Sequence, residues 1–170
     1  MTRYQKLPTA RRALAGRSLT ATDRRNPHPT SLNARISMIG NVGRGTSPEI
    51  ALRRGLAAAG VRGYRLNRRI EGVRPDIVLG RARTAVFVHG CFWHRCLTCR
   101  HPLPRSHRDF WLAKFRRNRQ RDREKRRRLE QAGWRVIEVW EHEIRDDLAQ
   151  IVHAIARSAR SISGVSVTRR

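Results

Sequence analysis

The sequence predicts an α/β domain in which a mixed central β-sheet is flanked by helices, and three observations lead to this class. Apolar residues recur at helical spacing in some stretches, whereas others are short β-branched runs bounded by glycines and charged turns. Their order along the chain is helix, three strands, helix, strand and helix, which is typical of a sheet covered by helices. The 170 residues and 39% hydrophobic content suit a single domain with one modest core.

The first helix is predicted over residues 46–60. Thr46 or Ser47 can cap its start, and Pro48 suits its first turn. Gly60 suits its end. Three strands of an antiparallel meander follow, at residues 64–70, 75–80 and 83–90.

A long and strongly charged helix is predicted over residues 107–133, with Gly133 at its end. The run WRVIEVWE at residues 134–141 indicates a further strand. The last helix carries a core-facing apolar stripe formed by Ile144, Leu148, Ile151, Val152 and Ile155.

The composition divides the chain into three segments. Residues 1–30 combine arginines and prolines with little periodic apolar content, and we expect them to be a basic, flexible extension. We expect residues 31–160 to form the folded domain and residues 161–170 to be a frayed tail.

Charge is the strongest global signal: 38 basic residues face 13 acidic ones, for a net charge of +25, and all but three of the basic residues are arginines. Arginine binds phosphate through a planar fork and stays charged, so nucleic acid is the expected partner. A compositional bias towards arginine and a membrane-surface protein are the alternatives. The chain has no run of about 18 apolar residues and no apolar secretion signal, so we expect an intracellular protein.

All three cysteines lie in one short stretch, at the spacing C-x4-C-x2-C. Clustered cysteines near histidines, in a chain without an export signal, indicate metal ligands rather than disulfides. Structural zinc takes four nitrogen or sulfur ligands in a tetrahedron, so Cys91, Cys96 and Cys99 need a fourth. The candidates for that fourth ligand are His94, His101, His107 and His142. The alternative is three small buried side chains with incidental histidines.

Asp76 and His89 indicate a second site. Asp76 begins one predicted strand and His89 ends the next, so antiparallel pairing brings them together. Oxygen ligands suit Mg²⁺, and a neutral histidine beside such a site can take a proton from water that attacks a phosphate. His94 follows closely along the chain. The alternative for Asp76 is a salt bridge with Arg74.

Four strings, in this order and spacing, resemble the very short patch repair (Vsr) DNA mismatch endonucleases. They are RPDIVL at 74–79, VFVHGCFWH at 86–94, DFWLAKFRRNRQRD at 109–122 and GWRVIEVWE at 133–141. The resemblance covers roughly residues 33–145. It implies a restriction-endonuclease-like fold and an enzyme that nicks one DNA strand 5′ to the thymine of a T:G mismatch, which arises when 5-methylcytosine deaminates.

The resemblance also implies catalytic roles for the matching residues. Asp76 would bind Mg²⁺ together with the backbone carbonyl of Val88, where the family usually has Thr. His89 and His94 would be the catalytic histidines, and Glu49 would be an acidic residue near them.

Further matches concern orientation and DNA binding. Asp122 would orient His89, and Phe92, Trp93 and Trp111 would wedge into the DNA beside the mismatch. The other predicted DNA contacts are Met38, Lys114, Arg116, Arg117, Asn118 and Arg121. For the residues on the long helix, a solvated helix face is the alternative, and for the aromatics it is ordinary core packing.

The zinc pattern departs from that of the family. Cys96 stands where a His is usual, Cys99 is displaced by one residue, and His142 occupies the place of the last Cys. The exchange preserves the number of ligands, and this favours His142 over His101 as the fourth.

The expected partner is therefore duplex DNA with a T:G mismatch, bound by a monomer in the cytoplasm and associated with the nucleoid. Coupling to mismatch-repair proteins and to a cytosine-5 methyltransferase is a further expectation from the resemblance. Two rivals remain at this point: a restriction endonuclease of the same fold that cuts intact sites, and a zinc-stabilised DNA-binding module without catalysis.

Overall fold

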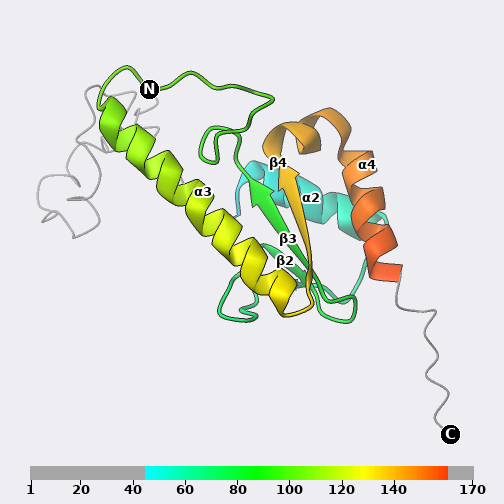
Figure 1. Ribbon diagram of the computed structural model, residues 1–170. Coiled ribbons are helices and arrows are strands. Elements are labelled where there is room, and N and C mark those ends of the chain that lie inside the picture. Colours follow the sequence, from blue (N-terminus) through cyan, green and yellow to red (C-terminus); the bar gives the residue numbers. More distant parts are fainter. Residues whose placement is uncertain (1–44, 161–170) are drawn as a thin grey trace, which may run out of the picture. The chain divides into compact units, whose positions relative to one another are not determined.

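The computed structural model describes residues 45–160, in which three helices and a four-stranded sheet are arranged as in Figure 1. The predicted extension at residues 1–30, the predicted DNA contact Met38 and the predicted tail at 161–170 lie outside the described residues. The helices are α2 (Ser47–Ala58), α3 (Arg108–Gln131) and α4 (Glu141–Arg160). The strands are β1 (Arg65–Leu66), β2 (Ile77–Leu79), β3 (Thr84–His89) and β4 (Arg135–Trp140).

The sheet has the order β1-β2-β3-β4 and is mixed, as predicted. Its first three strands form the predicted antiparallel meander, and β4 then pairs parallel to β3 after the chain has crossed over through α3. The first strand is much shorter than the predicted run at 64–70. Its register ends at Leu66 because Asn67 and, further on, Glu71 adopt positive φ angles of 51° and 47°, which turn the chain out of the sheet.

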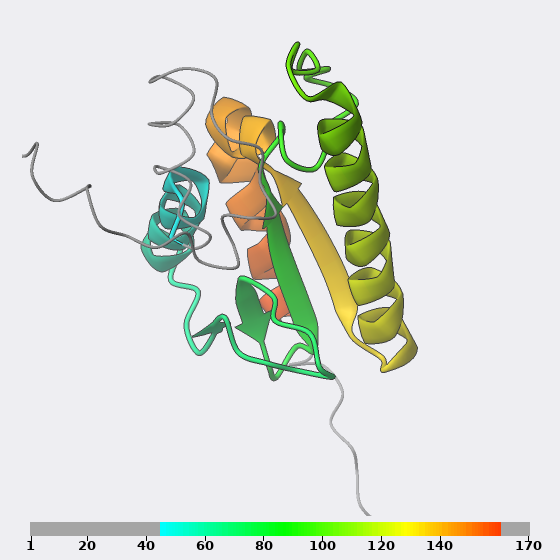
Figure 2. The same ribbon diagram turned by 90° about the vertical axis from the view of Figure 1, so that its left-hand side faces the viewer.

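Each face of the sheet is covered by helices, with α3 on one side and α2 and α4 on the other (Figure 2). The larger cluster of buried side chains lies between the sheet and the helices α2 and α4, and includes Leu52, Leu56, Val86, Val139 and Ile155. The smaller one lies under α3 and comprises Val73, Ala85, Phe87 and Leu129. The apolar stripe predicted for the last helix supplies much of the first cluster.

Strand alternation sends neighbouring residues of β3 to opposite faces. Val88 packs against the cluster under α2 and α4, whereas Phe87 belongs to the cluster under α3. His89, two residues from Phe87, stacks on that ring with centroids 6.3 Å apart and so shares the α3 face. The end of β3 therefore presents different chemistry on its two sides.

No helix between residues 45 and 160 is long and apolar enough to cross a membrane.

Candidate active site and zinc cluster

Asp76 lies immediately before the inner strand β2, in a hollow that it shares with Glu49 and Val88. The last residue pair between β2 and β3 is Ile77 with Val86. Just beyond it, the backbone N–H of Val88 donates a 2.8 Å hydrogen bond to Oδ2 of Asp76. The N–H and C=O of one strand residue face the same neighbour, so the Val88 carbonyl opens towards Asp76 as well.

The surroundings of Asp76 favour a cation. Burial and the negative charge of Glu49 raise the pKa of the Asp76 carboxyl, although the Val88 N–H acts in the opposite direction. A dication held by the carboxylate and the carbonyl would remove this electrostatic cost. Carboxylate and carbonyl oxygens are the ligands that Mg²⁺ accepts, so the donor set fits the predicted metal.

Glu49 lines this hollow from α2 but also serves the helix start. Its Oε2 accepts a 3.0 Å hydrogen bond from the N–H of Gly45, and its Oε1 accepts one of 2.8 Å from the hydroxyl of Thr46. A Glu at this position commonly satisfies the free N–H groups at a helix start. The structure thus places Glu49 beside Asp76 and gives it a capping role that was not predicted.

His94 and Asp122 form a hydrogen-bonded pair on the α3 side, with Nδ1 of His94 2.5 Å from Oδ2 of Asp122. Burial alone would favour the neutral acid, but the hydrogen bond and charge of His94 hold the pKa of Asp122 below its usual range. The prediction that Asp122 orients His89 is wrong, because its hydrogen bond goes to His94. The ring nitrogens of both histidines and the carboxylate of Asp122 nevertheless lie within 4.8 Å of one another.

His89 is buried beside this pair, with its ring centroid 4.3 Å from that of His94. Its acidic neighbour is Glu138 of β4, which was not predicted: Nε2 of His89 lies 3.7 Å from Oε1 of Glu138. His89 and the guanidinium of Arg126 hold the pKa of Glu138 below its usual range, against the effect of burial. A signal was present, since Glu138 is an acidic residue inside an otherwise apolar strand.

Three thiols and one imidazole converge next to the site. Nδ1 of His142 lies 3.3 Å from Sγ of Cys91 and 3.6 Å from Sγ of Cys96, and with Cys99 all four ligand atoms lie within 4.8 Å of one another. Burial and the neighbouring thiols raise the pKa of Cys91 to about 12, so three thiolates need a cation among them. Three sulfurs and one nitrogen form a donor set that is compatible with zinc.

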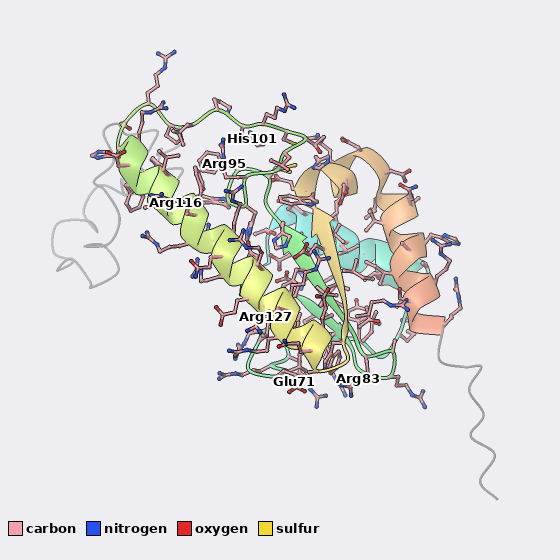
Figure 3. The ribbon with its side chains drawn as sticks, in the orientation of Figure 1. Glu71, Arg83, Arg95, His101, Arg116 and Arg127 are labelled. Carbon is pink, nitrogen blue, oxygen red and sulfur yellow. The ribbon has the colours of Figure 1, made fainter. Side chains whose placement is uncertain are left out.

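The other three histidines that were candidate ligands lie apart from this cluster. His94 is bonded to Asp122. The ring of His101 faces Phe92 at 6.3 Å, and its carbonyl accepts a hydrogen bond from Arg95. His107 is the exposed residue before α3. Figure 3 shows Arg95 and His101 in the long connection between β3 and α3.

The three predicted wedge aromatics come together in one group, which we call the aromatic cluster and define as Phe92, Trp93, Phe110, Trp111 and Phe115. Ring centroids within it lie 5.0 to 6.0 Å apart. Phe115 is buried, and the other four are only partly so. Nζ of Lys114 lies 5.2 Å from the ring centroids of both tryptophans, and burial lowers the pKa of this lysine.

Asn118, a predicted DNA contact, has partners within the protein. It is buried, its Nδ2 donates a 3.0 Å hydrogen bond to the carbonyl of Trp93, and its Oδ1 accepts one from Arg121. Both ends of the amide are therefore occupied, and Asn118 fastens the loop to α3. By contrast, Arg116 and Arg117 are exposed on the first half of the helix, as a phosphate contact requires (Figure 3 labels Arg116).

Known proteins resemble this chain in sequence. The sequence profile described as "DNA mismatch endonuclease Vsr" matches residues 30–100. The chain is 43% identical over 136 residues to the type II nicking enzyme V.NaeI of Lentzea aerocolonigenes, covering 75% of this chain and 81% of that enzyme. It is 42% identical over 101 residues to the type II nicking enzyme V.NmeAIP of Neisseria meningitidis, covering 59% of this chain and 71% of the relative.

The DNA mismatch endonuclease Vsr of Escherichia coli K12 is 43% identical over 72 residues, which is 42% of this chain and 46% of that protein. The match to a family of endonucleases excludes a DNA-binding module without catalysis. The chain belongs to the Vsr family and is a DNA endonuclease that cleaves phosphodiester bonds.

Proposed function

We propose that this endonuclease nicks one strand of duplex DNA 5′ to the thymine of a T:G mismatch, and that its fold is of the restriction-endonuclease-like type. The proposal rests on one observation: Trp93 of the aromatic cluster and His94 are consecutive residues of the chain. His94 and His89 together are called the histidine pair. An aromatic that enters an opened base step would thus stand beside the group that performs the chemistry.

The histidine pair supplies the proton transfers. His94, held by the ionised Asp122, accepts the proton of the water that attacks the phosphorus, while the buried His89 beside it is placed to give a proton to the leaving oxygen. Asp76, which accepts a hydrogen bond from the Val88 N–H, and the carbonyl of Val88 would hold Mg²⁺, and the metal would supply charge stabilisation to the phosphate oxygens.

The zinc ligands in this proposal are Cys91, Cys96, Cys99 and His142. Cys91 follows β3 by two residues, and His142 is the second residue of α4. Zinc at this point ties the loop that carries His94 to the body of the fold. A loop so fixed holds the imidazole and the aromatics in register.

Recognition is divided between the aromatic cluster and the charge of α3. Aromatic or apolar wedges unstack base steps, and the cost is least at a mispaired base. A base step that is easily unstacked would therefore be selected by Phe92, Trp93 and Trp111. Lys114 lies beside these rings. Arg116 and Arg117 attract the phosphates of any duplex.

Nicking at intact sites is the second candidate, because two of the relatives are named type II nicking enzymes. The experiment that separates the two functions uses one set of duplexes in varied flanking sequence, each prepared as T:G heteroduplex and as matched homoduplex. We expect Mg²⁺-dependent cleavage of only the thymine strand in the heteroduplex. Equal cleavage of the homoduplexes would assign the second function instead.

A further inference from the structure

We propose that Glu138 is a positioning residue for His89: its carboxylate fixes the orientation of the imidazole at the catalytic centre. The inference rests on the proposed catalytic role of His89. It concerns a residue of β4 that lies outside the metal-binding, proton-transfer and DNA-contacting groups described above.

The register of the sheet brings Glu138 to His89. Glu138 is paired with Phe87 across the parallel strands, and Trp140 is paired with His89. The Glu138 side chain rises on the α3 face, where Oε1 comes to 3.7 Å from Nε2 of His89. In residues 45–160, no other carboxylate lies within 4 Å of a ring nitrogen of His89.

The Asp122 carboxylate also lies within 4.8 Å of a ring nitrogen of His89, but it is hydrogen-bonded to His94. The other neighbours of His89 are rings, which set its plane but offer little to its nitrogens. Phe87 stacks on it at 6.3 Å and 6°, Trp140 lies at 5.3 Å, and His94 lies at 4.3 Å. The side chain of His89 is only 7% exposed. A carboxylate at Nε2 favours the tautomer with its proton on that nitrogen and resists a flip of the ring.

Glu138 is itself held in place from α3. Nη1 of Arg126 lies 3.1 Å from its Oε2, and Nε of the same arginine lies 3.1 Å from Oε1 of Glu130. A carboxylate inside an apolar strand is unfavourable unless it is paired. Arg126 offsets that cost and leaves Oε1 of Glu138 facing the histidine.

Glu130 provides a matched control, because it shares Arg126 with Glu138 and is exposed on α3, away from His89. The full chain is tested as wild type, Glu138→Gln, Glu138→Asp, Glu130→Gln, His89→Ala and the double variant His89→Ala/Glu138→Gln. Single-turnover nicking of a T:G duplex in Mg²⁺ gives the rate, binding without Mg²⁺ gives Kd, and circular dichroism verifies the fold.

We expect Glu138→Gln to slow nicking about 10- to 100-fold, the usual effect of losing a group that orients a functional histidine. Kd for the duplex should not change. Glu138→Asp should recover part of the rate, and Glu130→Gln should match wild type. In the His89→Ala background, Glu138→Gln should have no further effect, because the ring that it positions is gone.

Two results would overturn the inference while leaving the proposed function intact. The first is equal rates for Glu138→Gln and Glu130→Gln beside a His89→Ala enzyme that is slower than wild type. The second is a loss from Glu138→Gln that persists undiminished in the His89→Ala background. A His89→Ala enzyme with the wild-type rate would instead contradict the proposed catalytic role of His89, and the inference with it.

Discussion

The two sides of the end of β3 differ in chemistry and in how they are built. On the side of α2, Asp76 and the backbone of Val88 present oxygen atoms from neighbouring strands of the sheet, and Glu49 presents its carboxylate from α2. On the side of α3, His89 and His94 present nitrogens, and His94 belongs to a loop that needs fastening. Strand alternation would thus separate the proposed metal binding from the proposed proton transfer while keeping both next to one backbone bond.

The proposed zinc ligands Cys91, Cys96 and Cys99 lie in this loop, so removing one ligand of the set should have the largest effect. We expect His142→Ala to lose zinc, to loosen residues 91–99 and to abolish nicking, because structural zinc sites bind with about 10–16 kcal/mol. Elemental analysis and hydrogen exchange measure the first two effects. His101→Ala is the control and should keep one zinc per chain. Zinc retained in His142→Ala but lost in His101→Ala would move the fourth ligand to His101.

Asp76→Asn should remove the proposed metal binding without disturbing His89 and His94 on the other side of β3. Loss of the metal's charge stabilisation, several kcal/mol, corresponds to a decrease in rate of about 1,000-fold or more, with DNA binding retained. The fold should become more stable at neutral pH, because the raised pKa of Asp76 means that its ionised form destabilises the folded state.

The sign of this stability effect can be followed with pH. Asp76→Asn should raise the free energy of unfolding by its full amount at pH values above the raised pKa of Asp76. This difference from wild type should decrease as the Asp76 carboxyl is protonated, and it should vanish below the ordinary pKa of 3.8. Thermal melts across this range measure it. Asp146→Asn, at an exposed site paired only locally with Arg145, is the control. Destabilisation by Asp76→Asn at neutral pH would contradict the electrostatic description.

Trp93→Ala should separate recognition from chemistry. Each stacked base is worth about 1–3 kcal/mol, so binding to T:G duplex should weaken about 5- to 150-fold while the matched duplex is little affected. The salt dependence should not change, whereas Arg116→Gln should weaken both duplexes and reduce the salt slope by about one. If Trp93→Ala weakens binding to both duplexes equally, Trp93 supports the structure of the loop and does not recognise the mismatch.

The smallest effect concerns the pair of His94 and Asp122. The lowered pKa of Asp122 means that its ionised form stabilises the fold; this contribution is present above the ordinary value of 3.8 and is lost as pH falls through the lowered one. Asp122→Asn should therefore cost about 1 kcal/mol at neutral pH, and the difference from wild type should shrink in acid. A difference that is constant with pH would assign the loss to packing.

Most of the fold could be predicted because its signals are local. Helical spacing, capping residues and β-branched runs are set by neighbours in sequence, and they gave each helix and strand to within a few residues, apart from the shortened β1. The convergence of His142 with the three thiols was expected from the family resemblance, in which His142 occupies the place of the last Cys. The four ligands that zinc requires left four histidines open as the fourth.

The pairing of acids with histidines could not be predicted in the same way. Asp122 was predicted to orient His89, but it is hydrogen-bonded to His94. The contact between Glu138 and His89 was not predicted. These partners depend on the rotation of α3 about its axis and on the register of β4 against β3, both of which are decided by packing across the sheet. Asn118 is a similar case, since its burial and its hydrogen bond to the loop are visible only in the structure.

Asn118 and Asp122 are four residues apart on α3, and they hold two consecutive residues of the loop, Trp93 by its carbonyl and His94 by its ring. Side chains four apart lie one above the other on a helix. Inserting or deleting a single residue between them would rotate one by about 100° relative to the other, so both could no longer grip the loop. The spacing of three intervening residues is therefore required for both side chains to hold the loop.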